Sequence, residues 1–363
     1  MSEYTIEELL DQAEDYELYD VQPFLLAQQA EKLAEASGRP EDLFLTKAKV
    51  AQYASHVDKI EEAMVAVAWC FANRELLDEI DPQDQYRFLW MLKNLLRKAV
   101  DLPAIRLEQI ERVMQQTAEW YDEYGIGDQV IHLLRAQRSL IIGDTESMRQ
   151  HWETARTLPR DSMSDCLACE ADHRVHFCIA LDDDEQALEI AKPILEGELS
   201  CSTVPHRTYS TLLYPLLRLG RLDQARQMHQ AGYPKVHRRV DLVDPVALHI
   251  AFDVREGNTQ QALERFEANV HNFMEITAYT DRYSFLVAAE FLFEVLGQDQ
   301  SNCSVTLPKN FPLHREDGQY ETATLREYFR AEAQQLAEKF DRRNGNDHYS
   351  NQHRKELRLE VGA

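Results

Sequence analysis

Apolar residues recur along most of the chain at the spacing of one face of an α-helix. The i, i+3, i+4 pattern opens with Leu9, Leu10 and Ala13 and returns in the run from Phe88 to Leu96. Sustained alternation of apolar and polar positions, bounded by Asn-Gly or Asp-Gly turns, is not found, so the sequence predicts no strands. We therefore expect an all-α protein.

A turn recurs between helical patterns at nearly constant spacing. Its central residues lie 39, 38 and 37 residues apart by subtraction: Gly143, Asp182, Gly220 and Gly257. Gly, and less readily Asp, adopts the left-handed backbone that ends a helix. Five residues after each turn comes a packing position, filled by Met148, Ala187, Ala225 and Ala262, and four residues later a second, filled by Trp152, Ala191, His229 and Phe266. The repeat predicts stacked helical hairpins, each in contact with its neighbours.

These turns resemble those of the tetratricopeptide repeat (TPR) family. The segments 219–225 (Leu-Gly-Arg-Leu-Asp-Gln-Ala) and 256–262 (Glu-Gly-Asn-Thr-Gln-Gln-Ala) match its turn and its small packing residue. The resemblance is clear over about residues 125–275 and loose over about 41–80, and the period exceeds the family's usual 34 residues. The family's first-helix Trp and Tyr positions are mostly unfilled. The resemblance implies an α–α superhelix that binds a partner along its concave face.

The pattern divides the chain into four segments. Residues 1–298 are expected to form the TPR-like solenoid. Residues 299–319 contain two prolines and no helical period, which predicts an irregular strap. Residues 320–344 are predicted to be a capping helix over the last hairpin, and the polar residues 345–363 a frayed tail.

The net charge of −24 argues against a nucleic-acid partner, because such a partner requires clustered Lys and Arg. The acidity is compatible either with an ordinary solvated surface or with a partner that has a basic face. The first residues are acidic and lack the features of a signal peptide, and no apolar stretch approaches the ~20 residues that span a bilayer. We expect a cytoplasmic protein without a membrane partner.

Four residues form a candidate metal site. Cys166 and Cys169 are a Cys-x2-Cys pair, and Cys201 and His206 follow beyond the next helix. Stacked hairpins would bring the two helix starts together, so three thiolates and one imidazole could surround a structural zinc ion. Buried unreactive thiols and a redox pair are the alternatives. The spacing, with the Phe311-Pro312-Leu313 strap and the ending 339–345, also resembles an uncharacterised bacterial TPR group, which implies no activity.

The TPR resemblance also implies which residues face inward. Taking each turn residue as the fifteenth repeat position places Arg207, Tyr214, Arg218 and Arg255 on the inner face. Arg and Tyr are enriched at interface hot spots, and basic residues in an acidic chain favour a protein or peptide with an acidic segment. Alternatively, the arginines pair with nearby acids or complement helix C-termini.

Phosphate-binding loops, a nucleophile elbow and a zinc-protease motif are not found in the sequence. We therefore predict a non-enzymatic adaptor or scaffold that mediates protein–protein interaction. The alternative is a peptide- or ligand-responsive TPR-type regulator that controls a partner protein.

Overall fold

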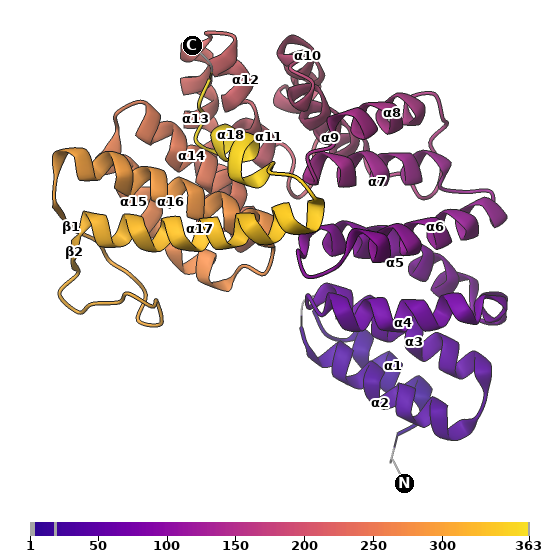
Figure 1. Cartoon of the computed structure of the whole chain (residues 1–363). Helices are drawn as coiled ribbons and strands as arrows, with labels where there is room; N and C mark the ends of the chain where they lie inside the picture. Colours follow the sequence, from indigo (N-terminus) through magenta and orange to yellow (C-terminus); the bar gives the residue numbers. More distant parts are fainter. Residues whose placement is uncertain (1–3, 18–19, 362–363) are drawn as a thin grey trace. The chain divides into compact units, whose positions relative to one another are not determined.

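The computed structural model describes residues 4–17 and 20–361 and is mostly helical, which confirms the all-α prediction (Figure 1). Residues 1–3 and 18–19 of the predicted solenoid and 362–363 of the predicted tail lie outside the described residues. The chain forms two compact units. Unit 1 comprises Met1–Arg138 and Glu153–Ser164, and unit 2 comprises Ser139–Trp152 and Asp165–Ala363. Within the described ranges, no helix is both long enough and apolar enough to cross a membrane.

Unit 1 is built from antiparallel helices whose apolar faces meet. Its elements are α1 (Ile6–Glu14), α2 (Gln22–Ser37), α3 (Pro40–His56), α4 (Ile60–Ala72), the 3-10 turn η1 (Arg74–Glu79), α5 (Pro82–Asp101) and α6 (Leu107–Glu123). Proline stands in the first turn of α2, α3 and α5, where its missing N–H leaves no helical bond unmade. Phe88 is buried in the core of this unit. Its ring is edge-on to those of Phe44 and Trp120, with ring centroids 5.8 Å and 5.7 Å apart.

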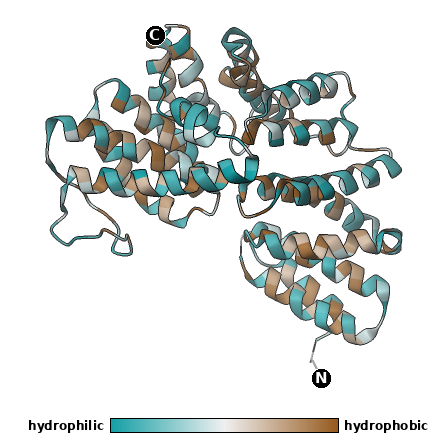
Figure 2. Cartoon of the chain, viewed as in Figure 1, coloured by the Kyte–Doolittle hydropathy of each residue, from teal (hydrophilic) through white to brown (hydrophobic). Residues whose placement is uncertain are grey.

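Helices α7 (Asp128–Ile141) and α8 (Thr145–Ala155) contribute residues to both units. Unit 2 continues with α9 (Leu167–Ala180), α10 (Asp184–Leu195), α11 (His206–Thr211), α12 (Leu213–Arg218), α13 (Leu222–Val236), the 3-10 turn η2 (Val240–Leu242), α14 (Val243–Arg255), α15 (Thr259–Glu275) and α16 (Tyr279–Asp299). Its last helices are α17 (Thr322–Asn344) and α18 (Arg354–Leu357), which follows the π-helical turn η3 (Tyr349–His353). Figure 2 shows apolar positions gathered where the helices of each unit face one another.

The four predicted turns share one backbone geometry. Their φ values are all positive: 78° at Gly143, 58° at Asp182, 69° at Gly220 and 77° at Gly257. After each turn, the next N–H donates to the carbonyl five residues earlier: Asp144 to Ser139, Asp183 to Cys178, Arg221 to Leu216 and Asn258 to Asp253, at 2.8–2.9 Å. This is the 6→1 bond that closes a helix C-terminus in the Schellman motif.

The packing positions that follow the turns are buried, as predicted. The first set, Met148, Ala187, Ala225 and Ala262, has 0% exposure, and the second set, Trp152, Ala191, His229 and Phe266, has at most 8%. The loosely matched segment repeats the geometry, with φ of 57° at Asp58, a 2.9 Å bond from Lys59 N–H to the Ala54 carbonyl, and a fully buried Ala63.

The segment after α16 is a packed strap that contains a small sheet. Strands β1 (Asn302–Ser304) and β2 (Gln319–Glu321) pair antiparallel, with Cys303 opposite Tyr320. The prediction of no strands is therefore wrong here, because three residues are too few for an alternating pattern to show. Helix α17 then packs on α16, and the four residues predicted for its apolar face are buried: Leu325, Phe329, Leu336 and Phe340.

The last described residues, 345–361, are folded, which corrects the prediction of a frayed tail. Tyr349 stacks on Phe340 with ring centroids 4.2 Å apart, and its N–H donates to the Asp341 carboxylate at 2.8 Å. Leu357 and Leu359 are buried as well. The segment is mostly polar, but three of its apolar side chains are buried: Tyr349, Leu357 and Leu359.

Two glycines with the same backbone test the turn geometry. A Cβ at Gly257 would meet no atom within 4 Å, whereas one at Gly143 would come within 2.5 Å of the His348 ring. We expect Gly257→Ala to lower the free energy of unfolding by about 1 kcal/mol through left-handed strain alone. Gly143→Ala should cost about 2–4 kcal/mol, because overpacking adds to the strain. Chemical unfolding of the two variants measures the difference, and equal losses would contradict the contact between Gly143 and His348.

Candidate metal centre

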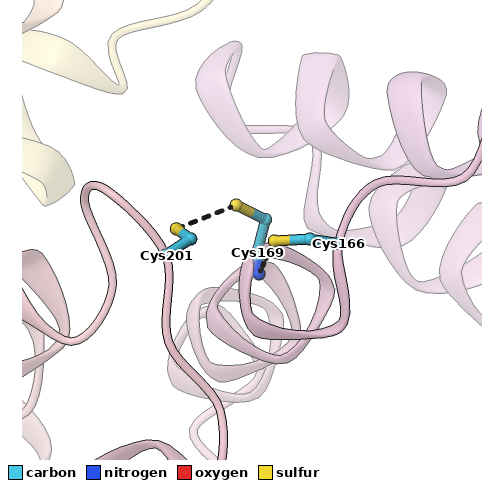
Figure 3. A group of neighbouring side chains, drawn as sticks. All are labelled: Cys166, Cys169 and Cys201. Carbon is cyan, nitrogen blue, oxygen red and sulfur yellow. Dashed lines mark hydrogen bonds between the residues drawn. The ribbon is translucent and has the colours of Figure 1, made fainter.

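Three cysteine thiols meet at the start of α9 (Figure 3). Cys166 is the residue that caps α9, and its Sγ accepts from the N–H of Cys169 at 3.4 Å. Cys201 lies in the loop between α10 and α11, and its Sγ is 3.5 Å from that of Cys169. All three sulfur atoms lie within 4.8 Å of one another.

A local turn and an apolar contact hold the Cys201 loop against α9. The N–H of Cys201 donates to the carbonyl of Val204 at 2.8 Å, which closes a tight turn. Val204 is 1% exposed and packs with Ala168 and Ala171 of α9 and with Ile194 of α10. The packing of Val204 therefore positions the thiol of Cys201.

The surroundings of Cys169 and Cys201 shift the pKa values of their thiols in opposite directions. Burial, together with hydrogen bonds to Cys166 and Cys201, raises the pKa of Cys169. Burial also opposes ionisation of Cys201, but hydrogen bonds from the Thr203 and Val204 main chain lower its pKa. The start of α9 adds the positive end of a helix dipole, which favours thiolate. Cys201 is thus the first of this pair to ionise.

The arrangement is suited to a metal ion. Tetrahedral zinc with Zn–S bonds of 2.3 Å requires sulfur atoms about 3.8 Å apart, and the observed separations run from 3.5 Å to within 4.8 Å. A disulfide requires about 2.05 Å, and all six cysteines are free thiols. Cys166, Cys169 and Cys201 can therefore hold a metal ion, which confirms that three of the four predicted ligands come together.

The fourth predicted ligand, His206, is the first residue of α11 and does not belong to this group. Its Nδ1 is buried and has no hydrogen-bond partner among the described residues. Burial and the nearby charges of Arg239 and Lys235 lower the pKa of its imidazole, which keeps the ring neutral, the form that binds metals.

The predicted partner-binding residues make contacts within unit 2. The guanidinium of Arg218 pairs with Asp182 and Asp184 and donates to the Ile179 carbonyl at 2.9 Å. Burial opposes the charge of Arg207, but surrounding carboxylates raise its pKa, those of Asp281 and Asp172 most strongly. The charges of these two arginines are therefore balanced by acids of the protein itself.

The other two predicted residues contact the end of the chain. Arg255 donates from Nη1 to the Leu359 carbonyl at 2.8 Å, and the Tyr214 hydroxyl lies 3.4 Å from the Glu360 carbonyl. Both partners belong to the segment that the sequence predicts to be frayed. One sequence feature could have revealed that this segment is attached. Arg354 and Arg358 are four residues apart, as are their ion-pair partners Glu290 and Glu294 on α16.

The thiols should differ in their reaction with an alkylating agent, because only thiolate is nucleophilic. In metal-free folded protein near neutral pH, we expect Cys201 to be modified before Cys169. Burial raises the pKa of Cys70, so this thiol should react only after unfolding. Mass spectrometry of iodoacetamide-treated protein over time gives the order, and modification of Cys70 at the rate of Cys201 would contradict it.

We compared the chain with models of known protein families, with curated proteins and with solved structures, and none of them matches. The resemblance to TPR proteins therefore depends on the turn residues and on their geometry.

Proposed function

We propose that this chain is a non-enzymatic, TPR-like solenoid that binds a partner protein or peptide on the inner face of its first helices. The proposal is carried by the repeated turn: four hairpins share a left-handed residue, a 6→1 bond and a fully buried packing residue. In unit 2, α10 contacts α11 and α12, α13 contacts α14, and α14 contacts α16, which supports hairpins that pack in sequence. Such stacks offer long surfaces for binding.

Two of the predicted inner-face residues contact main-chain carbonyl groups, which supports recognition of a polypeptide. Arg255 and Tyr214 both reach main-chain carbonyl groups rather than a particular side chain. Main-chain recognition gives affinity for a peptide without fixing its sequence. The acidic segment predicted for the partner would be bound through Arg255, since Arg207 and Arg218 already face carboxylates.

The peptide-responsive regulator is the second candidate. It is favoured by the contact of this surface with the chain's own residues 359 and 360. A surface occupied within the protein can respond to a competing ligand by releasing the internal one.

We further propose that the metal is a structural zinc ion bound by Cys166, Cys169, Cys201 and His206. Zinc prefers thiolate and imidazole ligands, and a site with four protein ligands is closed to substrate. The ion would join the start of α9 to the loop before α11, and so tie two successive hairpins together. The buried, unpaired Nδ1 of His206 supports its inclusion.

Protein purified without chelator should contain about one zinc ion per chain, as measured by mass spectrometry of the metal. Cys169→Ser should lose the metal, while Cys303→Ser, a matched change at a buried thiol elsewhere, should keep it. Removing zinc should lower the free energy of unfolding by about 2.7 kcal/mol when free zinc was about a hundredfold above its Kd. Zinc affinity should fall as pH falls, because protons compete for the thiolates.

Full metal content in Cys169→Ser would show that the ion binds elsewhere. His206→Ala separates the two possible ligand sets: weaker zinc binding supports four ligands, and unchanged binding leaves the three thiolates alone.

The partner surface is tested with Arg255→Glu, using a partner recovered from the native host by co-purification. We expect at least a tenfold loss of affinity, because the guanidinium that binds a main-chain carbonyl becomes a carboxylate that repels it. Arg226→Glu is the matched control, since Arg226 is exposed and pairs with Glu256 and Asp223. Equal affinities of the two variants by calorimetry would place the partner elsewhere. Arg218→Glu is unsuitable, because it would put three carboxylates together and disturb the fold.

A further inference from the structure

Residues 354–360, the last part of unit 2, contact other helices of the same unit as a bound peptide would. Helix α18 contacts α14 and α16 (Figure 1). The carbonyls that follow it accept from Arg255 and Tyr214. The carbonyls of Arg354, Lys355 and Glu356 accept from N–H groups of residues 358–360. The predicted inner face supplies donors to carbonyls further along the chain, those of Leu359 and Glu360.

Two ion pairs one helical turn apart join the segment to α16. Arg354 pairs with Glu290, and Arg358 pairs with Glu294 at 3.1 Å. The side chain of Glu290 is only 3% exposed, so Arg354 provides the positive charge that this buried carboxylate needs. Arg358 also lies over the Phe291 ring, 4.5 Å from its centroid. This face of α16 therefore favours a ligand with two basic side chains four residues apart.

A strained residue ends the segment. Leu359 has a φ of 54°, and this left-handed backbone costs a non-glycine residue about 1–3 kcal/mol. The residue is 0% exposed, and the N–H of Glu360 donates to the Lys355 carbonyl at 2.9 Å, so this local 6→1 bond, burial of the side chain and the bond from Arg255 hold the conformation.

We propose that residues 354–360 are a displaceable internal ligand, and that the partner binds unit 2 by replacing them with a segment of the same chemistry. That segment is a short helix with two basic residues at i, i+4 and an apolar residue between them, followed by main-chain carbonyls that can accept from Arg255 and Tyr214. This inference depends on the proposed function, because it names the partner class of the same face. It favours a basic contact at α16, whereas the sequence predicts an acidic partner segment.

The segment itself is the probe, so the experiment does not require the natural partner. A fluorescein-labelled peptide of residues 346–363 is titrated with full-length protein, and its anisotropy is measured. The tethered copy competes at an effective concentration on the order of millimolar, so the wild-type chain should bind the peptide weakly. The full chain with Arg354→Glu and Arg358→Glu should bind it at least tenfold more tightly, because Glu290 and Glu294 repel the altered tethered copy.

The matched control is the full chain with Arg39→Glu and Arg315→Glu, which changes charge equally at exposed arginines that pair with Asp42 and Asp317 rather than with the glutamates of α16. It should bind the peptide as weakly as the wild type does. A peptide that carries Arg354→Glu and Arg358→Glu should not bind any of the three proteins. Equal binding of the wild-type peptide by the wild type and by a folded Arg354→Glu, Arg358→Glu chain would overturn the proposal.

Hydrogen–deuterium exchange of the wild-type chain gives a second test that involves no substitution. Amides of residues 354–360 should exchange at least about a hundredfold faster than those of α16 and α17, which corresponds to local opening of the segment. Exchange as slow as that of α16 would show a permanent part of the fold and overturn the proposal. If Arg255→Glu left the affinity for the partner unchanged while the peptide bound as expected, the proposed partner surface would be rejected. The proposal of an internal ligand would stand.

Discussion

The hydrogen bond that closes the four repeated helical turns is the constraint on which the hairpins of the repeat depend. It requires a left-handed residue one place before the donor, which explains Gly143, Gly220 and Gly257, and Asp182 at the remaining turn. Because the bond fixes where the second helix begins, it also fixes which residue lies five places on and faces the first helix. Only a side chain that fits between the two helices can stand there, and three of the four are Ala.

The helical hairpins could be predicted because their determinants are local. A turn residue and a packing position five residues later are both visible in the sequence, and neither depends on distant contacts. His229 shows the limit of this reasoning: it occupies a packing position, buried at 6% exposure, because Asp253 and His249 satisfy its ring nitrogens. The polar neighbours that permit a buried histidine come from α14, and sequence spacing alone does not reveal them.

The metal centre could be predicted only in part for the same reason. The Cys-x2-Cys pair is local to the start of α9, and the repeat brings Cys201 next to it. The orientation of His206 depends on how the loop turns after Val204, and that turn is set by packing against α9 and α10. The three thiols within 4.8 Å of one another could hold a metal ion, and the position of His206 relative to them depends on that loop.

The C-terminal segment shows how contacts distant in sequence can reverse an interpretation. Residues 345–361 are polar and carry no helical period long enough to predict a packed element, yet 64 positions separate each of the pairs Arg354–Glu290 and Arg358–Glu294. Equal separation means that the two pairs keep one register along α16, so each stabilises the geometry of the other. A segment attached in this way, through ion pairs at its surface and a strained leucine at its end, is bound by contacts that a basic segment of another protein could also make. The contacts that complete the fold of unit 2 are therefore the ones on which the proposed displacement would act.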